Sequence, residues 1–188
     1  QDTIMTAMRS ILGLSAICLA ACQPTYNWRD VSFEGTRVKA QLPCKPDRAT
    51  RVVTIGESPV PLQVAGCEAG GGMWVVMTTL LPAGQDPQKV LLGWQTATWR
   101  NLHNSTPQNA SVDTAGPPNQ PWQAPQALPG AVRVSTQVTQ ADGQVLQVHG
   151  VWVAWAQPDG TQWVNAMVYH QNLPAVAADT FFESLRQP

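Results

Sequence analysis

Histidine and carboxylate side chains, the usual acid–base and metal-binding groups, are few and scattered in this chain. The three histidines are His103, His149 and His170. The acidic residues show no spacing typical of a carboxylate pair or a metal motif, and no serine lies in a Gly-x-Ser-x-Gly context. The Gly70–Gly72 run lacks the Lys and Ser/Thr of a phosphate-binding loop. The sequence therefore predicts no catalytic residue, no cofactor and no metal site.

Two of the histidines leave an alternative open. His103 is expected near the end of a helix, where an imidazole suits the negative pole of the helix dipole. His149 and His170 are expected on strands, where a polar residue at the rim of a sheet is ordinary. If the fold brought these two onto neighbouring strands, they would form a candidate acid–base or metal pair. A hydrolase is therefore kept as an alternative.

Cysteine gives the clearest chemical signal, at the N-terminal end. Arg9 is followed by the apolar run Ile11–Ala21, which ends in Leu-Ala-Ala before Cys22. A basic region, a short apolar core and small residues at the cleavage point are typical of a secretory signal. These last four residues resemble the lipobox of bacterial lipoprotein precursors, in which the cysteine becomes the lipid-bearing N-terminus. An uncleaved membrane anchor is the alternative, but spanning a bilayer takes roughly 20 apolar residues.

The lipobox resemblance implies a compartment and a domain organisation. Residues 1–21 would be removed, residues 22–27 would form a lipidated tether, and residues 28–188 would form a single domain. Acyl chains on Cys22 would make the attachment to the membrane effectively permanent. Gln23 stands where an inner-membrane retention signal would carry Asp, which implies the periplasmic face of the outer membrane. The expected partners are the membrane, through this anchor, and other envelope proteins.

The remaining cysteines are expected to form one disulfide. Cys18 leaves with the signal and Cys22 carries lipid, so Cys44 and Cys67 are left as a pair. Two such thiols in an oxidising compartment most simply form a structural bridge. A metal pair or a redox-active pair is the alternative. Their spacing is far from Cys-x-x-Cys and no histidine lies near either residue, which disfavours that alternative.

Charge and aromatic content suggest one candidate surface. The formal net charge is −1 and only 12% of the residues are charged, which argues against nucleic acid because such partners need a basic footprint. Basic residues gather between Arg29 and Arg51, where they could face an anion. The chain also has eight tryptophans, of which at least one is expected to reach the surface. The candidate binding surface consists of Arg37, Lys39, Trp99, Trp122 and Trp155.

The first half of the chain reads as strands followed by a helix. Strands are expected at Trp28–Phe33, Thr36–Leu42, Arg51–Ile55, Val60–Glu68 and Met73–Leu81. Asp86 is a good helix N-cap and Pro87 suits the first helical position, which predicts a helix to about His103. Residues 104–130 hold six prolines and predict an extended, partly mobile surface loop, with Trp122 attaching it to the body.

The second half reads as an antiparallel meander that ends in a helix. Strands are expected at Ala131–Thr139, Gln144–Ala156 and Thr161–Gln171, joined by Asp-Gly turns, and the helix begins at Pro174. Both faces of the last two strands are apolar, so both must be covered. The sequence therefore predicts an α+β fold, mainly an antiparallel sheet of about six to seven strands with two helices packed on it.

Two segments support a family resemblance. The ending Phe-Phe-Glu-Ser-Leu at residues 181–185 and the Pro-Cys-Lys-Pro segment at residues 43–46, with Cys67 downstream, occur in an order of elements that resembles small envelope proteins of the PsbP/DcrB-like fold group. The resemblance implies an α+β fold, a role as an assembly factor or accessory subunit, and no catalytic residues. The expected function is a lipid-anchored, non-catalytic accessory or assembly subunit of a bacterial envelope complex. The alternative is a small-ligand or lipid carrier with a cleft beside the sheet.

Overall fold

A computed structural model describes residues 24–55, 58–104, 119–140 and 142–188. The strands are β1 (Arg29–Ser32), β2 (Lys39–Leu42), β3 (Asp47–Ile55), β4 (Ser58–Ala69), β5 (Gly72–Pro82), β6 (Gln120–Pro121), β7 (Val132–Thr139), β8 (Val145–Gln157) and β9 (Gly160–His170). The helices are α1 (Pro87–Asn104) and α2 (Ala175–Glu183). Cys22, the predicted signal and residues 105–118 of the Pro-rich loop lie outside the described residues.

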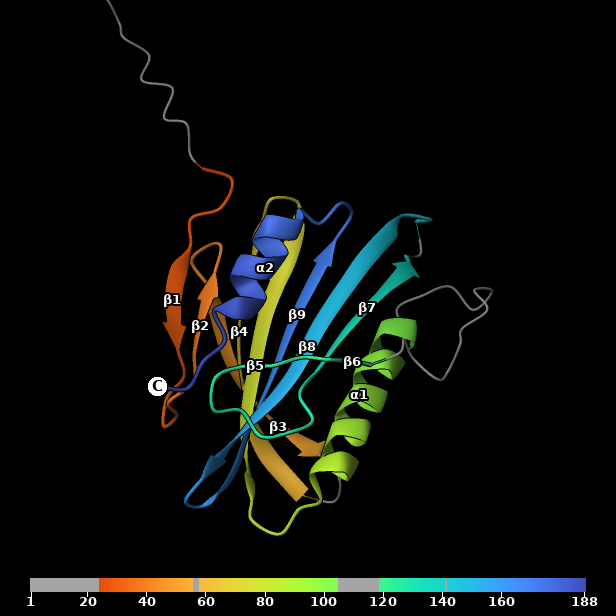
Figure 1. Ribbon diagram of the computed structural model, residues 1–188. Coiled ribbons are helices and arrows are strands. Elements are labelled where there is room, and N and C mark those ends of the chain that lie inside the picture. Colours follow the sequence, from red (N-terminus) through yellow and green to blue (C-terminus); the bar gives the residue numbers. More distant parts are fainter. Residues whose placement is uncertain (1–23, 56–57, 105–118, 141) are drawn as a thin grey trace, which may run out of the picture.

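The main sheet has seven described strands in the order β3-β4-β5-β9-β8-β7-β6, and every neighbouring pair is antiparallel (Figure 1). Strands β1 and β2 pair with each other in a separate two-stranded sheet. The predicted α+β fold with a mainly antiparallel sheet and two helices is confirmed. After β5 the chain passes through α1 and enters the sheet again at β6 and β7, on the far edge. Strands β8 and β9 then lie between β7 and β5.

Local sequence signals explain where these elements begin and turn. The Asp86 carboxylate accepts a hydrogen bond of 2.9 Å from the Gln88 amide, so the predicted N-cap of α1 is present. Gly70 and Gly71 form the turn between β4 and β5, and both have positive φ angles (61° and 78°). Such a two-residue hairpin favours glycine because both central residues need φ above zero.

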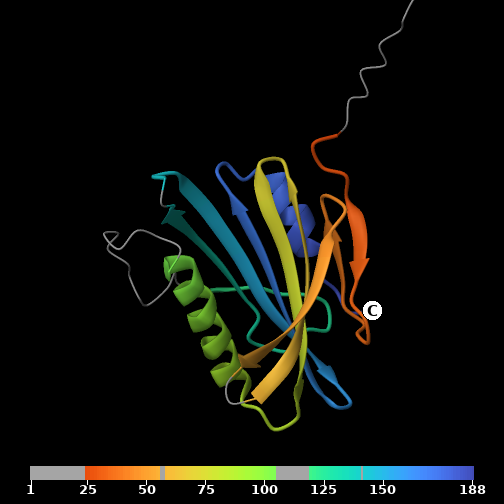
Figure 2. The same cartoon turned by 180° about the vertical axis from the view of Figure 1, so that it is seen from behind.

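The side chains of the main sheet form two separate hydrophobic layers, as the apolar alternation predicts. On one face, α1 packs over Leu81, Val148, Trp152, Trp163 and Met167. On the other face, α2 and the small sheet pack over Trp74, Val76, Val153, Trp155 and Val168. In Figure 1, α2 lies in front of the sheet, and it lies behind the sheet in the reverse view of Figure 2. We call these the α1 face and the α2 face.

The small sheet is held to the rest of the molecule by backbone and covalent links. The Lys39 amide donates to the Arg186 carbonyl (2.8 Å), and the Arg186 amide donates to the Lys39 carbonyl (3.0 Å), so the chain after α2 pairs with β2. Cys44, just beyond β2, forms a disulfide with Cys67 on β4. The predicted bridge is confirmed, and it joins the two sheets.

Candidate functional site

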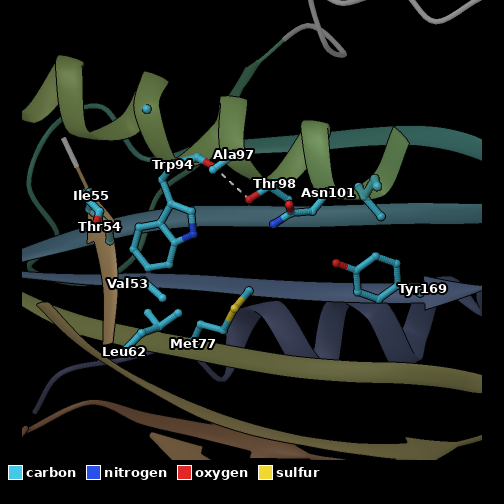
Figure 3. A pocket seen from close by; sticks show the side chains of 12 residues that line it. Val53, Thr54, Ile55, Leu62, Met77, Trp94, Ala97, Thr98, Asn101 and Tyr169 are labelled. Carbon is cyan, nitrogen blue, oxygen red and sulfur yellow. Dashed lines mark hydrogen bonds between the residues drawn. The ribbon is translucent and has the colours of Figure 1, made fainter. Parts of the chain in front are cut away.

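A hollow in the described structure lies between α1 and the sheet. Its volume is about 490 Å³. Figure 3 shows side chains from α1 projecting toward those on the strands beneath it. The lining residues are Val53, Thr54, Ile55, Leu62, Met77, Gly93, Trp94, Ala97, Thr98, Asn101, Leu102 and Tyr169. They come from β3, β4, β5, β9 and α1. We call this hollow the α1 cavity.

Small residues on one flank of α1 leave the α1 cavity open. The helix anchors itself with Val90, Leu91, Trp94 and Trp99, each of which is buried on the α1 face. Gly93 and Ala97 are four residues apart, so they share a flank one turn apart along the helix. Neither carries a side chain long enough to reach the sheet. The space between this flank and strands β3, β4 and β5 therefore remains unfilled.

The described lining of the α1 cavity is mostly apolar and contains no charged side chain. None of its described lining residues is Asp, Glu, Lys, Arg or His. The polar side chains are those of Thr54, Thr98, Asn101 and Tyr169. The Thr98 hydroxyl donates to the Trp94 carbonyl (2.9 Å), and burial raises the pKa of the Tyr169 phenol. Tyr169 is therefore protonated at neutral pH. These groups can bind a ligand by hydrogen bonding, but they supply no general base or nucleophile.

A second hollow, of about 470 Å³, borders the first at Tyr169. It is lined by residues 68–73, Gln140, Leu146 and Tyr169, and Glu68 gives it one acidic side chain. The sequence predicts only a structural role for Gly70–Gly72, as backbone before a buried strand. Gly70 and Gly71 have a structural role, because they form the turn between β4 and β5. Gly72 lies against His170, so a side chain at position 72 would collide with the imidazole ring.

The three tryptophans of the candidate surface lie in different parts of the fold, and the expected exposure is absent for two of them, Trp99 and Trp155. Trp155 is 1% exposed on the α2 face, and its indole N–H donates to the Pro125 carbonyl (3.0 Å). Trp99 is 8% exposed on the α1 face and meets Trp152 edge to face. Trp122 is partly buried against the α2-face core, as expected of a residue that attaches the Pro-rich segment. The segment around Pro125 thus covers Trp155.

The basic members of the candidate surface lie apart from the α1 cavity. Arg37 is exposed just before β2, and Lys39 is half-buried on β2 beside Arg186. Arg48 has a structural role, because its guanidinium donates to the Ser32 carbonyl (2.8 Å) and lies over the Phe33 ring. The residues expected to form one binding surface are therefore distributed over different parts of the fold.

His149 and His170 lie on neighbouring strands, but each has its own partner. In the pairing of β8 with β9, His149 lies opposite Val168 and His170 lies opposite Gln147. The two histidines are therefore diagonal neighbours on the α2 face. The His149 Nδ1 atom lies 2.8 Å from the Ser135 hydroxyl, and the Asn172 amide donates to His170 Nδ1 (2.9 Å). Burial, and secondarily Arg133, lowers the pKa of His149, so its ring is neutral at pH 7. The side chain of His103 lies outside the description.

No cluster of metal ligands is present in the described part of the chain. No three His, Cys, Asp or Glu side chains of the described residues lie close enough together to hold an ion. Neither described helix is long and apolar enough to cross a membrane. Within the described ranges, the α1 cavity is a candidate ligand site with a mostly apolar lining. The residues that line it were missed at the sequence level, although the small residues at positions 93 and 97 of an otherwise bulky helix were a signal.

Comparison with known proteins adds no relative. No protein-family model, curated protein or solved structure matches this chain. The resemblance to the PsbP/DcrB-like group therefore stays a prediction.

Proposed function

We propose that this protein binds a small apolar ligand in the α1 cavity and acts as a carrier or sensor rather than as an enzyme. The observation that carries the proposal is the uncharged, mostly apolar lining of a hollow of about 490 Å³. Pockets for small molecules typically enclose about 300–1,000 Å³ and combine apolar walls with a few polar groups. Trp94, Leu62 and Met77 supply such walls, and Thr98, Asn101 and Tyr169 supply such groups.

Packing energetics favour a ligand in this hollow, which opens to the surface beside the exposed residues Gly93, Ala97 and Asn101. Protein interiors are close-packed and contain few voids larger than a water molecule. Elsewhere on the α1 face the packing is tight, since Val148, Trp152 and Met167 are fully buried. An apolar hollow offers water few hydrogen bonds, and filling it with an apolar molecule restores the missing van der Waals contacts. The lipid anchor predicted at Cys22 would hold this cavity beside a membrane, which is a source of apolar ligands.

Replacing Ala97 with tryptophan is expected to block the α1 cavity. The new indole would occupy the space below α1, so the affinity for the neutral apolar dye Nile red should fall about tenfold or more. Dye fluorescence titration measures this affinity. Thr96→Trp is the matched control, because Thr96 is exposed on the same helix and does not line the cavity. Dye binding that Ala97→Trp leaves unchanged, or the absence of dye binding in the wild-type protein, would contradict the proposal.

The accessory role expected from the sequence is a second candidate, supported by the edge strand β3. Among the described residues, β3 pairs with β4 and with no other strand, and six of its nine residues, Asp47–Val52, are exposed in succession. An exposed edge strand can accept a strand from a partner through backbone hydrogen bonds. Envelope proteins are the partners that the predicted anchor would bring close.

A photo-crosslinking amino acid at Val52 tests this second candidate in membranes. Val52 is 75% exposed on β3, and Val176 is 79% exposed on α2, so crosslinks from position 176 serve as the background. We expect a defined envelope protein to be crosslinked from position 52 and not from position 176. Equal crosslinking from the two positions would contradict a partner at the β3 edge.

A further inference from the structure

The α1 cavity has an apolar end and a polar end. Ile55, Leu62 and Trp94 gather at one end in Figure 3, and Asn101 and Tyr169 lie toward the other. The Tyr169 hydroxyl points into the space between α1 and the sheet, on the side where Asn101 and Thr98 project from the helix. A ligand that fits both ends must itself be amphipathic.

The Tyr169 hydroxyl is an unused hydrogen-bonding group. No residue in the described ranges donates to it or accepts from it within hydrogen-bond distance. A phenol carries one donor and can also accept, so this hydroxyl is available to a ligand. Because burial raises the pKa of this phenol, it keeps its proton and can donate at neutral pH. A hydroxyl or carbonyl oxygen on a ligand would satisfy it.

Two electrostatic features disfavour an ionised ligand group in the α1 cavity. Among the described lining residues, no charged side chain is available to pair with a carboxylate, phosphate or ammonium. Moving a charge from water into an apolar site is unfavourable when no group there pairs with it. The polar end also lies at the last turns of α1, since Asn101 and Leu102 line it and the helix ends at Asn104. The negative pole of the helix dipole is located there and opposes an anion.

We infer that the α1 cavity selects an uncharged amphiphile, with an apolar chain or ring at the Trp94 end and one neutral oxygen group hydrogen-bonded to Tyr169. This inference rests on the proposed ligand-binding function and specifies the chemical class of the ligand. It makes Tyr169 a specificity-determining residue, because the other cavity walls contribute apolar contacts that any hydrophobic chain could use.

Competition between matched amphiphiles tests the ligand class. Dodecanol, dodecanoate and dodecyltrimethylammonium share one chain length and differ in charge, since the carboxylate is ionised at about pH 8. Each would be titrated below its aggregation concentration against Nile red bound to the full protein. Dodecanol should displace the dye at concentrations about tenfold lower than either charged probe. Equal displacement by dodecanoate, or no displacement by dodecanol while the dye still binds, would overturn this inference and leave the ligand-binding function standing.

The two tyrosines of the chain give a matched pair of variants. Tyr169→Phe removes the hydroxyl from the α1 cavity, and Tyr26→Phe removes a hydroxyl next to the α2-face core. Loss of one neutral hydrogen bond should weaken dodecanol binding about two- to tenfold in Tyr169→Phe. Nile red affinity should stay unchanged in both variants, and dodecanol affinity should stay unchanged in Tyr26→Phe. Unchanged dodecanol binding in Tyr169→Phe would show that the hydroxyl does not select the ligand.

Discussion

Replacing Phe181 with alanine should lower the free energy of unfolding by about 3–5 kcal/mol, the range typical of large aromatic truncations in a core. Phe181 is 0% exposed. Its ring meets Trp74 edge to face with centroids 5.4 Å apart, and it packs against Phe182 at 5.1 Å. The truncation removes these contacts and leaves a void between α2 and the sheet. A loss of this size is a large part of the total stability of a domain of this kind.

Urea unfolding of matched variants measures this effect. Val176→Ala on the same helix is the control, because Val176 is 79% exposed and its truncation should change the stability by no more than about 0.5 kcal/mol. Phe181→Leu keeps most of the buried volume and should cost less than Phe181→Ala, which preserves the test if the alanine variant fails to fold. A Phe181→Ala variant as stable as Val176→Ala would show that α2 is not an essential cover of the sheet.

Removing the Cys44–Cys67 bridge should lower the free energy of unfolding by about 2–4 kcal/mol. The two cysteines are 23 positions apart, so the bridge closes a loop that contains all of β3 and most of β4. Without it, the unfolded chain gains conformational freedom, and the small β1–β2 sheet loses its covalent link to the main sheet. The measurement is chemical denaturation of the Cys44→Ala, Cys67→Ala double variant against the oxidised wild-type protein.

Two controls separate the bridge from the loss of two side chains. Reduced wild-type protein should unfold at a denaturant concentration close to that of the double variant, because both lack the same constraint. Thiol titration of the oxidised protein under denaturing conditions should find neither Cys44 nor Cys67 reactive. Reactive thiols at both Cys44 and Cys67 in that titration, or an unchanged midpoint in the double variant, would contradict the bridge.

The predicted elements whose signals are local in the sequence agree with the structure. Asp86 and Pro87 mark the start of α1 because capping depends on residues within one turn. Alternation along β8 and β9 assigned Trp152 and Trp155 to opposite faces, and both faces proved to be covered. This follows because strand geometry repeats every two residues wherever the strand lies in the fold. The pairing of Cys44 with Cys67 followed from counting the cysteines that remain after the predicted signal and lipid site.

The depth of each side chain and the shape of the space between elements were decided by the tertiary structure. The sequence identified Trp155 as a candidate for exposure, but the segment around Pro125 folds back over it and leaves it 1% exposed. Strands β1 and β2 form a sheet of their own rather than part of the main sheet. The α1 cavity combines Tyr169 with residues of β3 and α1 that lie more than sixty positions away along the chain. Side-chain periodicity determines the direction in which a residue points. What covers the residue depends on contacts between segments far apart in sequence, which no local pattern encodes.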